Sequence, residues 1–132
     1  MSHETLVEYW LDKADDDLAS AQDNFAAGRL FNAVRDAYFA CFHAFSAVLL
    51  GSRKNFRKHK EVRSALHRDF IRTKKLQAQW GKHYDWLFEN RQKADYRPLV
   101  HFDPNQVGDI IEKSEAFVQE MKRFIKISGI AQ

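Results

Sequence analysis

Apolar residues along the chain recur with the spacing of α-helices. In the first 28 residues they stand alternately four and three positions apart, with acidic side chains on the opposite side: Val7, Leu11, Ala14, Leu18, Ala21 and Phe25. This pattern predicts a long amphipathic helix that ends near Gly28, since glycine suits the left-handed geometry of a helix C-terminus. Residues 30–50 are apolar nearly all round, which predicts a central helix that touches several neighbours at once.

Two further helices are expected in the middle of the chain. A short third helix follows from the apolar positions Val62, Ala65, Leu66 and Phe70. A fourth is marked by Trp80, Tyr84, Leu87 and Ala94. It must end near Tyr96, because Pro98 disfavours helical geometry in the residue before it.

The last helix has the clearest start signal in the sequence. Asp103 is a suitable N-cap, Pro104 takes the first helical position and Gln106 lies three residues after the cap. No segment alternates with a period of two for long enough to predict a strand. We therefore expect an all-α fold, an antiparallel helical bundle of about five helices, four long and one short, forming a single domain over residues 1–132.

Composition excludes several classes of protein. One cysteine in 132 residues can form neither an internal disulfide nor a cysteine-based zinc site. The N-terminus turns acidic where a signal peptide would be basic and then apolar, and residues 37–50 are too short and too polar to span a bilayer. We therefore expect a cytoplasmic protein that does not enter a membrane.

Charge is distributed unevenly along the chain. Residues 1–28 hold seven acidic residues and one basic residue, whereas residues 53–75 hold ten basic residues and two acidic ones. A segment with this much positive charge would attract phosphate-bearing partners. The candidate phosphate-binding residues are Arg53, Lys54, Arg57, Lys58, His59, Lys60 and Arg63. Alternatively, the acidic and basic segments neutralise each other within one chain or across a dimer.

Polar residues in the central helix need partners. Arg35, Asp36 and His43 stand among apolar residues, where burial without a partner is costly. They could line a polar site between helices; alternatively, Arg35 pairs with an acid of the first helix and His43 is a satisfied core histidine. The six histidines show no metal-ligand spacing, and the chain has neither a glycine-rich phosphate loop nor a nucleophile elbow. We expect no metal and no cofactor.

Three segments carry a family resemblance: AVRDAYFACFH at residues 33–43, His59-Lys60 after a basic turn, and LFENRQKADY at residues 87–96 before a break and a capped final helix. Occurring in this order, they resemble the HEPN family over residues 6–126. The resemblance implies a helical bundle that commonly forms homodimers. It also implies a metal-independent ribonuclease or the toxin half of a pair with a small nucleotidyltransferase.

The active members of that family share an arginine near the end of a helix, followed after four to six residues by a histidine. Arg91 matches the arginine, but the expected histidine positions hold Tyr96, Arg97 and Pro98, and His101 comes later. Arg53 and His59 have the bare spacing but lie away from the motif position, so we interpret that match as fortuitous.

RNA cleavage without a metal needs a base, an acid and a cation for the phosphate. The candidate catalytic residues are Arg91, Asp95, Tyr96 and His101, and His59 or His43 is an alternative source of the missing imidazole. Two hypotheses stay open: an RNA-directed HEPN protein, with or without residual ribonuclease activity, and a non-catalytic module that docks a nucleotidyltransferase or another protein. A homodimer is expected in both, because 14% of the residues are aromatic and Trp10, Trp86 and Phe88 are candidates for exposure.

Overall fold

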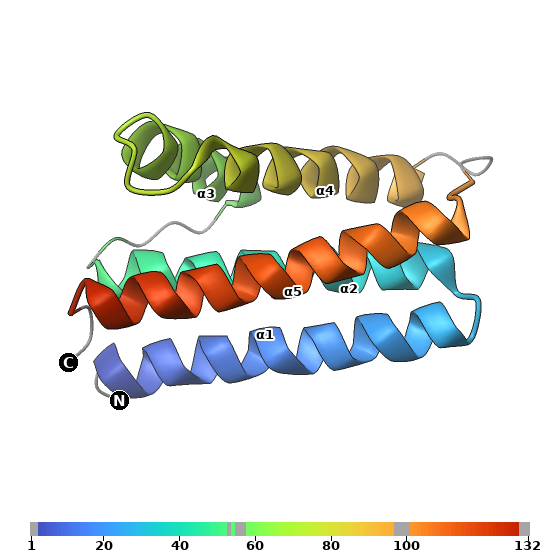
Figure 1. The fold of residues 1–132 in the computed structure, drawn as a ribbon, viewed down its shortest axis with the longest axis horizontal. Helices are drawn as coiled ribbons and strands as arrows, with labels where there is room; N and C mark the ends of the chain where they lie inside the picture. Colours follow the sequence, from blue (N-terminus) through green and yellow to red (C-terminus); the bar gives the residue numbers. More distant parts are fainter. Residues whose placement is uncertain (1–2, 53, 55–57, 97–100, 130–132) are drawn as a thin grey trace.

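The helices predicted from the sequence are confirmed in the computed structural model, which describes residues 3–52, 54, 58–96 and 101–129. The elements are α1 (His3–Ala26), α2 (Leu30–Gly51), α3 (His59–Ala65), the π-helical segment η1 (Leu66–Ile71), α4 (Ala78–Tyr96) and α5 (Pro104–Ile127). No strand occurs in these residues. The fold is an all-α bundle (Figure 1).

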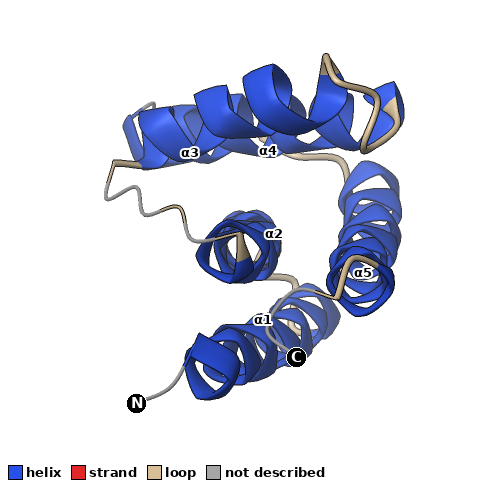
Figure 2. Ribbon diagram, turned by 90° about the vertical axis from the view of Figure 1, so that its left-hand side faces the viewer, coloured by secondary structure: helices blue, strands red, loops and turns tan. Residues whose placement is uncertain are grey.

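Helix α2 forms the centre of the bundle, as its nearly uniform apolar sequence predicts. Seen end-on, it has α1 on one side, α5 on the next, and α3 with α4 above (Figure 2). Tyr38 and Phe45 of α2 are fully buried among these helices. The fourth side of α2, between α1 and α3, carries no helix of the described residues, and below we call it the open side of α2 (Figure 2). Phe42 and His43 lie on this side, because Phe42 stacks on His59 of α3 and His43 stacks on Trp10 of α1. Phe39 contacts both histidines.

The predicted helix ends are present. After α1, Gly28 has φ +78°, and the backbone N–H of Arg29 donates to the carbonyl of Asn24 over 2.8 Å, which is the hydrogen bond of a Schellman motif. Before α5, the Asp103 side chain accepts from the backbone N–H of Asn105, with Pro104 at the first helical position. These local signals therefore fix where α1 stops and α5 starts.

The third helix differs from its expected form. It begins as an α-helix at His59, but from Leu66 to Ile71 it widens to π-helical geometry. A π-helical segment is rare and is often found at functional sites. Within this segment His67 is hydrogen-bonded to Asp85, which lies between Ala78 and Tyr96 in α4, and the Arg68 side chain is exposed.

Helix α2 is long and apolar enough to cross a membrane by length and composition, although 67% of its most apolar window is buried inside the bundle. Burial of this kind is expected of the core helix of a soluble domain. The apolar character of α2 is explained by its contacts with α1, α4 and α5.

Candidate functional site

Arg91 lies on α4 and reaches across to the aromatic residues of α2. The carbon at the centre of its guanidinium is 4.7 Å from the centre of the Tyr38 ring and 5.7 Å from that of Phe39. A cation over an aromatic face is attracted by the electron-rich ring. The Arg91 side chain remains 19% exposed, so the guanidinium is held in place yet can be reached by an anion.

Asp95 lies between two guanidinium groups. One of its oxygens is 3.7 Å from Arg91 Nη1, the predicted pair one helical turn apart, and the other is 3.3 Å from Arg35 Nη2 of α2. Two expectations for Arg35 are wrong: its side chain is 52% exposed, and its acidic partner is on α4 and not on the first helix. Residue 35 falls where α2 faces α4 at the surface, which periodicity alone does not indicate.

His59, at the start of α3, contacts the same tyrosine as Arg91. Its Nδ1 is 2.7 Å from the Tyr38 hydroxyl, and its ring stacks on Phe42 with the centres 4.2 Å apart. Burial lowers the pKa of His59, and the positive charge of Arg91 lowers it further. The imidazole is therefore neutral at pH 7 and lies beside a fixed cation.

His43 is the second imidazole on the open side of α2. It is buried, with Nδ1 2.5 Å from an Asp17 oxygen of α1 and its ring stacked on Trp10. It also contacts Phe39 and Phe42, the rings that His59 contacts. Thus His43 has the acidic partner expected of a satisfied core histidine and still belongs to the cluster around Arg91.

Asp36 points away from this cluster. It is half-buried and accepts a hydrogen bond of 2.7 Å from the Asn24 side-chain amide, which ties α2 to the end of α1. Burial raises the pKa of its carboxyl group. Its contacts support the fold and bring no group into the Arg91 site.

The basic segment forms a groove over α3, η1 and α4. This groove has a volume of about 600 Å³ and is lined by Lys60, Arg63, Ser64, His67, Arg68, Arg72 and Asp85. Asp85 is engaged by Arg63 Nε and by His67 Nε2, each at 2.8 Å. Arg68 is bonded to both carboxylate oxygens of Asp69, each at 3.0 Å, so Lys60 and Arg72 are the groove bases left to attract anions. Arg68 and Arg72 were not selected from the sequence, although their four-residue spacing from Lys60 and Ser64 is the signal of one helical face.

The groove and the Arg91 site are connected. The guanidinium of Arg63 lies 4.7 Å from the centre of the Phe88 ring, and Phe88 in turn contacts Tyr38. Phe88 is buried by these contacts, so the expectation that it is exposed is wrong, while Trp10 and Trp86 are half-buried. Phe88 therefore lies between Arg63 of the groove and Tyr38 of the Arg91 site.

Other candidates lie elsewhere. Lys54 pairs with Asp69 at 3.0 Å, Lys58 is exposed before α3, and Arg53 and Arg57 lie outside the described residues. Tyr96 ends α4, and its side chain also lies outside them. His101 is exposed before α5, and nowhere in the described ranges does a hydrogen bond, ion pair or ring contact join it to Arg91. Its catalytic role stays a prediction.

Within one chain, the basic segment does not neutralise the acidic one where the structure is described; neutralisation across a dimer stays a prediction. Asp15 of α1 pairs with Lys122 of α5, and Asp17 with His43, whereas the basic segment pairs with Asp69, Asp85 and Glu89. Within residues 3–52, 54, 58–96 and 101–129, no three His, Cys, Asp or Glu side chains gather as metal ligands do.

The sequence is similar to those of known proteins. The HEPN domain model matches residues 7–124. A UPF0332 protein of Thermotoga maritima is 37% identical over 123 residues, which cover 93% of each chain. Two proteins of Methanocaldococcus jannaschii, each named "Putative toxin", are 23% and 27% identical, covering 90% and 91% of this chain and 81% and 89% of their own. The chain therefore belongs to the HEPN domain family and is related to proteins named as toxins.

Proposed function

We propose that this protein is a cytoplasmic, RNA-directed HEPN toxin that cleaves single-stranded RNA without a metal ion. The observation that carries the proposal is the shared ring: the neutral His59 imidazole and the Arg91 guanidinium both lie against Tyr38. This chain has no histidine at the position that the family signature requires, and in this proposal His59 at the start of α3 takes its place. The basic groove supports the proposal, because it offers phosphate-binding groups beside this pair.

Each of these groups has a defined role in the proposed reaction. His59 accepts the proton of the 2′-hydroxyl, the 2′-oxygen attacks phosphorus, and the bond to the 5′-oxygen breaks as that oxygen takes up a proton. For His59 to act as the base at Nε2, its Nδ1–H must donate to the Tyr38 hydroxyl. Arg91 stabilises the charge that gathers on the phosphate oxygens. The second proton comes from another imidazole, either His43 in the same cluster or the histidine of a second copy.

A second function is favoured by the open side of α2. Trp10, Phe39 and Phe42 are half-buried there, without a covering helix in the described part of the chain. We propose this face as the surface for a second copy of the chain. The alternative is that it docks a nucleotidyltransferase and that the bundle has no chemistry of its own.

The experiment follows the integrity of single-stranded RNA over time with the wild type and with Arg91→Ala and His59→Ala. Loss of the general base or of the cation should reduce the cleavage rate by about 10²- to 10⁴-fold. Arg123→Ala is the matched arginine control, because Arg123 is exposed on α5 and bonded to Glu120. His101→Ala tests the remaining histidine that the sequence predicts for the site.

Each outcome decides between the functions. Cleavage that survives both Arg91→Ala and His59→Ala, or that disappears only in His101→Ala, contradicts the proposed site. Absence of cleavage and of RNA binding at low salt, together with a stable complex with a nucleotidyltransferase, establishes the docking function. Binding through the groove should weaken steeply as salt rises, because bound cations on the RNA are released when protein bases replace them.

A further inference from the structure

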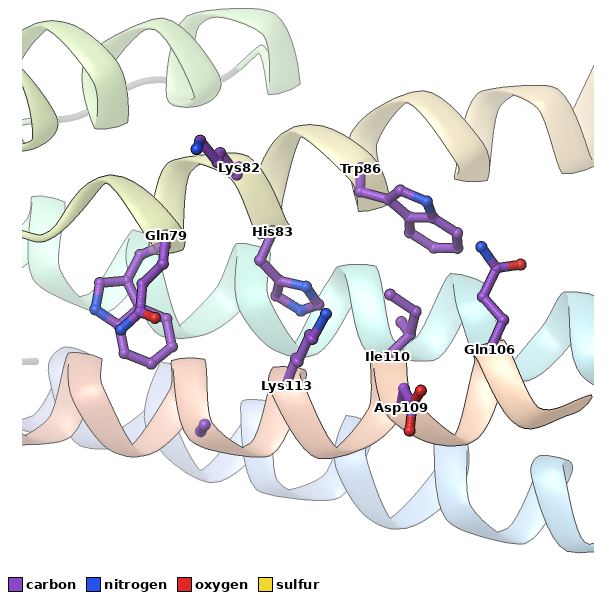
Figure 3. A pocket seen from close by; sticks show the side chains of 10 residues that line it. Gln79, Lys82, His83, Trp86, Gln106, Asp109, Ile110 and Lys113 are labelled. Carbon is purple, nitrogen blue, oxygen red and sulfur yellow. The ribbon is translucent and has the colours of Figure 1, made fainter.

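A second cavity lies between α4 and α5, apart from the Arg91 site, which faces α2. Its volume is about 560 Å³, within the range of small-molecule sites. Figure 3 shows Trp86 and His83 descending from α4, with Gln106, Ile110 and Lys113 on α5 below them. The groups that matter for recognition are Trp80, His83, Trp86, Gln106 and Lys113. Nothing in the proposed RNA cleavage uses this cavity.

The walls of the cavity are suited to a flat ring. Trp80 and Trp86 stand on one helix with His83 midway between them, and a separation of six residues is about 9 Å along the helix axis. The side chain of Ile110 lines the α5 side. Both indoles are half-buried: Trp80 packs edge-on against Phe117 and Trp86 packs against Phe102, and each also lines the cavity. Aromatic faces bind other planar rings by offset stacking or edge contacts.

The contacts around His83 determine which of its two ring nitrogens can accept a hydrogen bond. The Ser114 hydroxyl donates to the Ile110 carbonyl over 2.8 Å, so its oxygen accepts from His83 Nε2 over 2.9 Å. The proton is then on Nε2, and Nδ1 carries a lone pair. Burial lowers the pKa of His83 to about 4, with Lys113 contributing, which keeps the ring neutral. Nothing else in the described chain forms a hydrogen bond with this imidazole.

Helix α5 adds polar groups around this acceptor. Gln106 and Lys113 are seven residues apart, two helical turns, and both extend from α5 toward α4 (Figure 3). Neither is held by a hydrogen bond or an ion pair to another described residue. An aromatic hollow with one buried acceptor and a few free polar side chains is the usual composition of a ligand site.

We propose that this cavity binds a nucleobase-type ring, a planar heteroaromatic group with an N–H donor that bonds to His83 Nδ1 between Trp80 and Trp86. Such a ring can come from a free nucleoside or from an unpaired base of an RNA strand. Purines carry the larger stacking face and so are the better fit to two indoles. Binding at this site is independent of cleavage at Arg91.

The test titrates the full chain with adenosine, guanosine and uridine while NMR records the indole N–H signals of Trp80, Trp86 and Trp10. A purine nucleoside should shift the first two signals and leave Trp10, on α1, unchanged. Ala116→Trp places a bulky group at an exposed position of the cavity wall and should weaken binding at least 10-fold. Ala19→Trp, the same change at an exposed position of α1, should bind as the wild type does.

The source of the ring is separated by competition. An oligoadenylate that displaces adenosine, where an abasic strand of equal length does not, identifies an RNA base as a ligand; a free nucleoside that alone binds identifies a small-molecule site. Absence of any indole shift at millimolar nucleoside, or equal affinity in Ala116→Trp, overturns the proposal. Loss of nucleoside binding in Arg91→Ala would place the ring at the other site and also overturn it. Failure here leaves RNA cleavage by Arg91 and His59 unaffected.

Discussion

Replacing Tyr38 by phenylalanine isolates the contact that joins His59 to the Arg91 site. Tyr38 is fully buried, and its hydroxyl lies 2.7 Å from His59 Nδ1. Phenylalanine keeps the ring beneath Arg91 and the surrounding packing, so one hydrogen bond is removed. The loss should lower the free energy of unfolding by about 1 kcal/mol, and by up to about 3 kcal/mol if the imidazole nitrogen finds no other partner.

Urea denaturation followed by circular dichroism measures this change. His59→Ala and the double variant complete a thermodynamic cycle, in which the coupling between hydroxyl and imidazole should be about 1 kcal/mol. Thermal unfolding should shift by roughly 4 °C for each kcal/mol in a domain of this size. RNA cleavage should fall by about 10²-fold or more, because His59 loses the group that orients it while Arg91 keeps its ring.

Additive effects of the two substitutions on stability would refute this reasoning. If the effects of Tyr38→Phe and His59→Ala on stability sum to that of the double variant within about 0.5 kcal/mol, the two groups do not interact energetically. If Tyr38→Phe cleaves RNA at the wild-type rate, orientation of His59 by the hydroxyl is not needed for the reaction.

Three further predictions concern stability and are read from urea midpoints. The pKa of His83 is about 4 in the folded chain, against an ordinary value of 6.5, so the unfolded chain binds the proton more readily. The contribution of His83 to the free energy of unfolding is therefore complete above pH 6.5, and that free energy should fall by about 1–2 kcal/mol by pH 5. His83→Gln should show a shallower pH dependence across that window, and an equal one would contradict the assignment. Phe45→Ala removes a fully buried ring and should cost about 3–5 kcal/mol, whereas Ile127→Ala, at a position 66% exposed, should cost less than about 0.5 kcal/mol. Asp103→Ala should cost about 1 kcal/mol through loss of the α5 cap, and an unchanged midpoint would show that Pro104 alone starts the helix.

Helix positions were accessible from the sequence because they depend on interactions between residues a few positions apart. The three-four spacing of α1, the Gly28 terminus and the Asp103 start all appear in the structure where the pattern places them. Family membership was accessible too, because the segments that carry it are continuous stretches of chain. The basic side of α3 was recognised for the same reason, although its extension to Arg68 and Arg72 was missed.

The histidine of the site could not be located from the sequence in this way, because its neighbours in the fold are remote along the chain. No histidine stands at the motif spacing after Arg91, and the sequence offered His59 only as one of several alternative sources of the imidazole. The fold brings it to Tyr38, 21 positions away in sequence, which Arg91 also contacts. Tyr38 itself was not selected as a site residue, although it shares a helical face with Arg35 and Phe42.

By itself, then, the sequence determined the five helices, their ends, the central place of α2 and the family, since hydrophobic period and capping act within one or two helical turns. Only the tertiary structure decided which acid pairs with Arg35, which imidazole lies beside Arg91, and that α4 and α5 leave a cavity lined by indoles. Those outcomes depend on how helices pack across long stretches of chain, and residue spacing along one helix carries no information about the side chains that another helix brings to it.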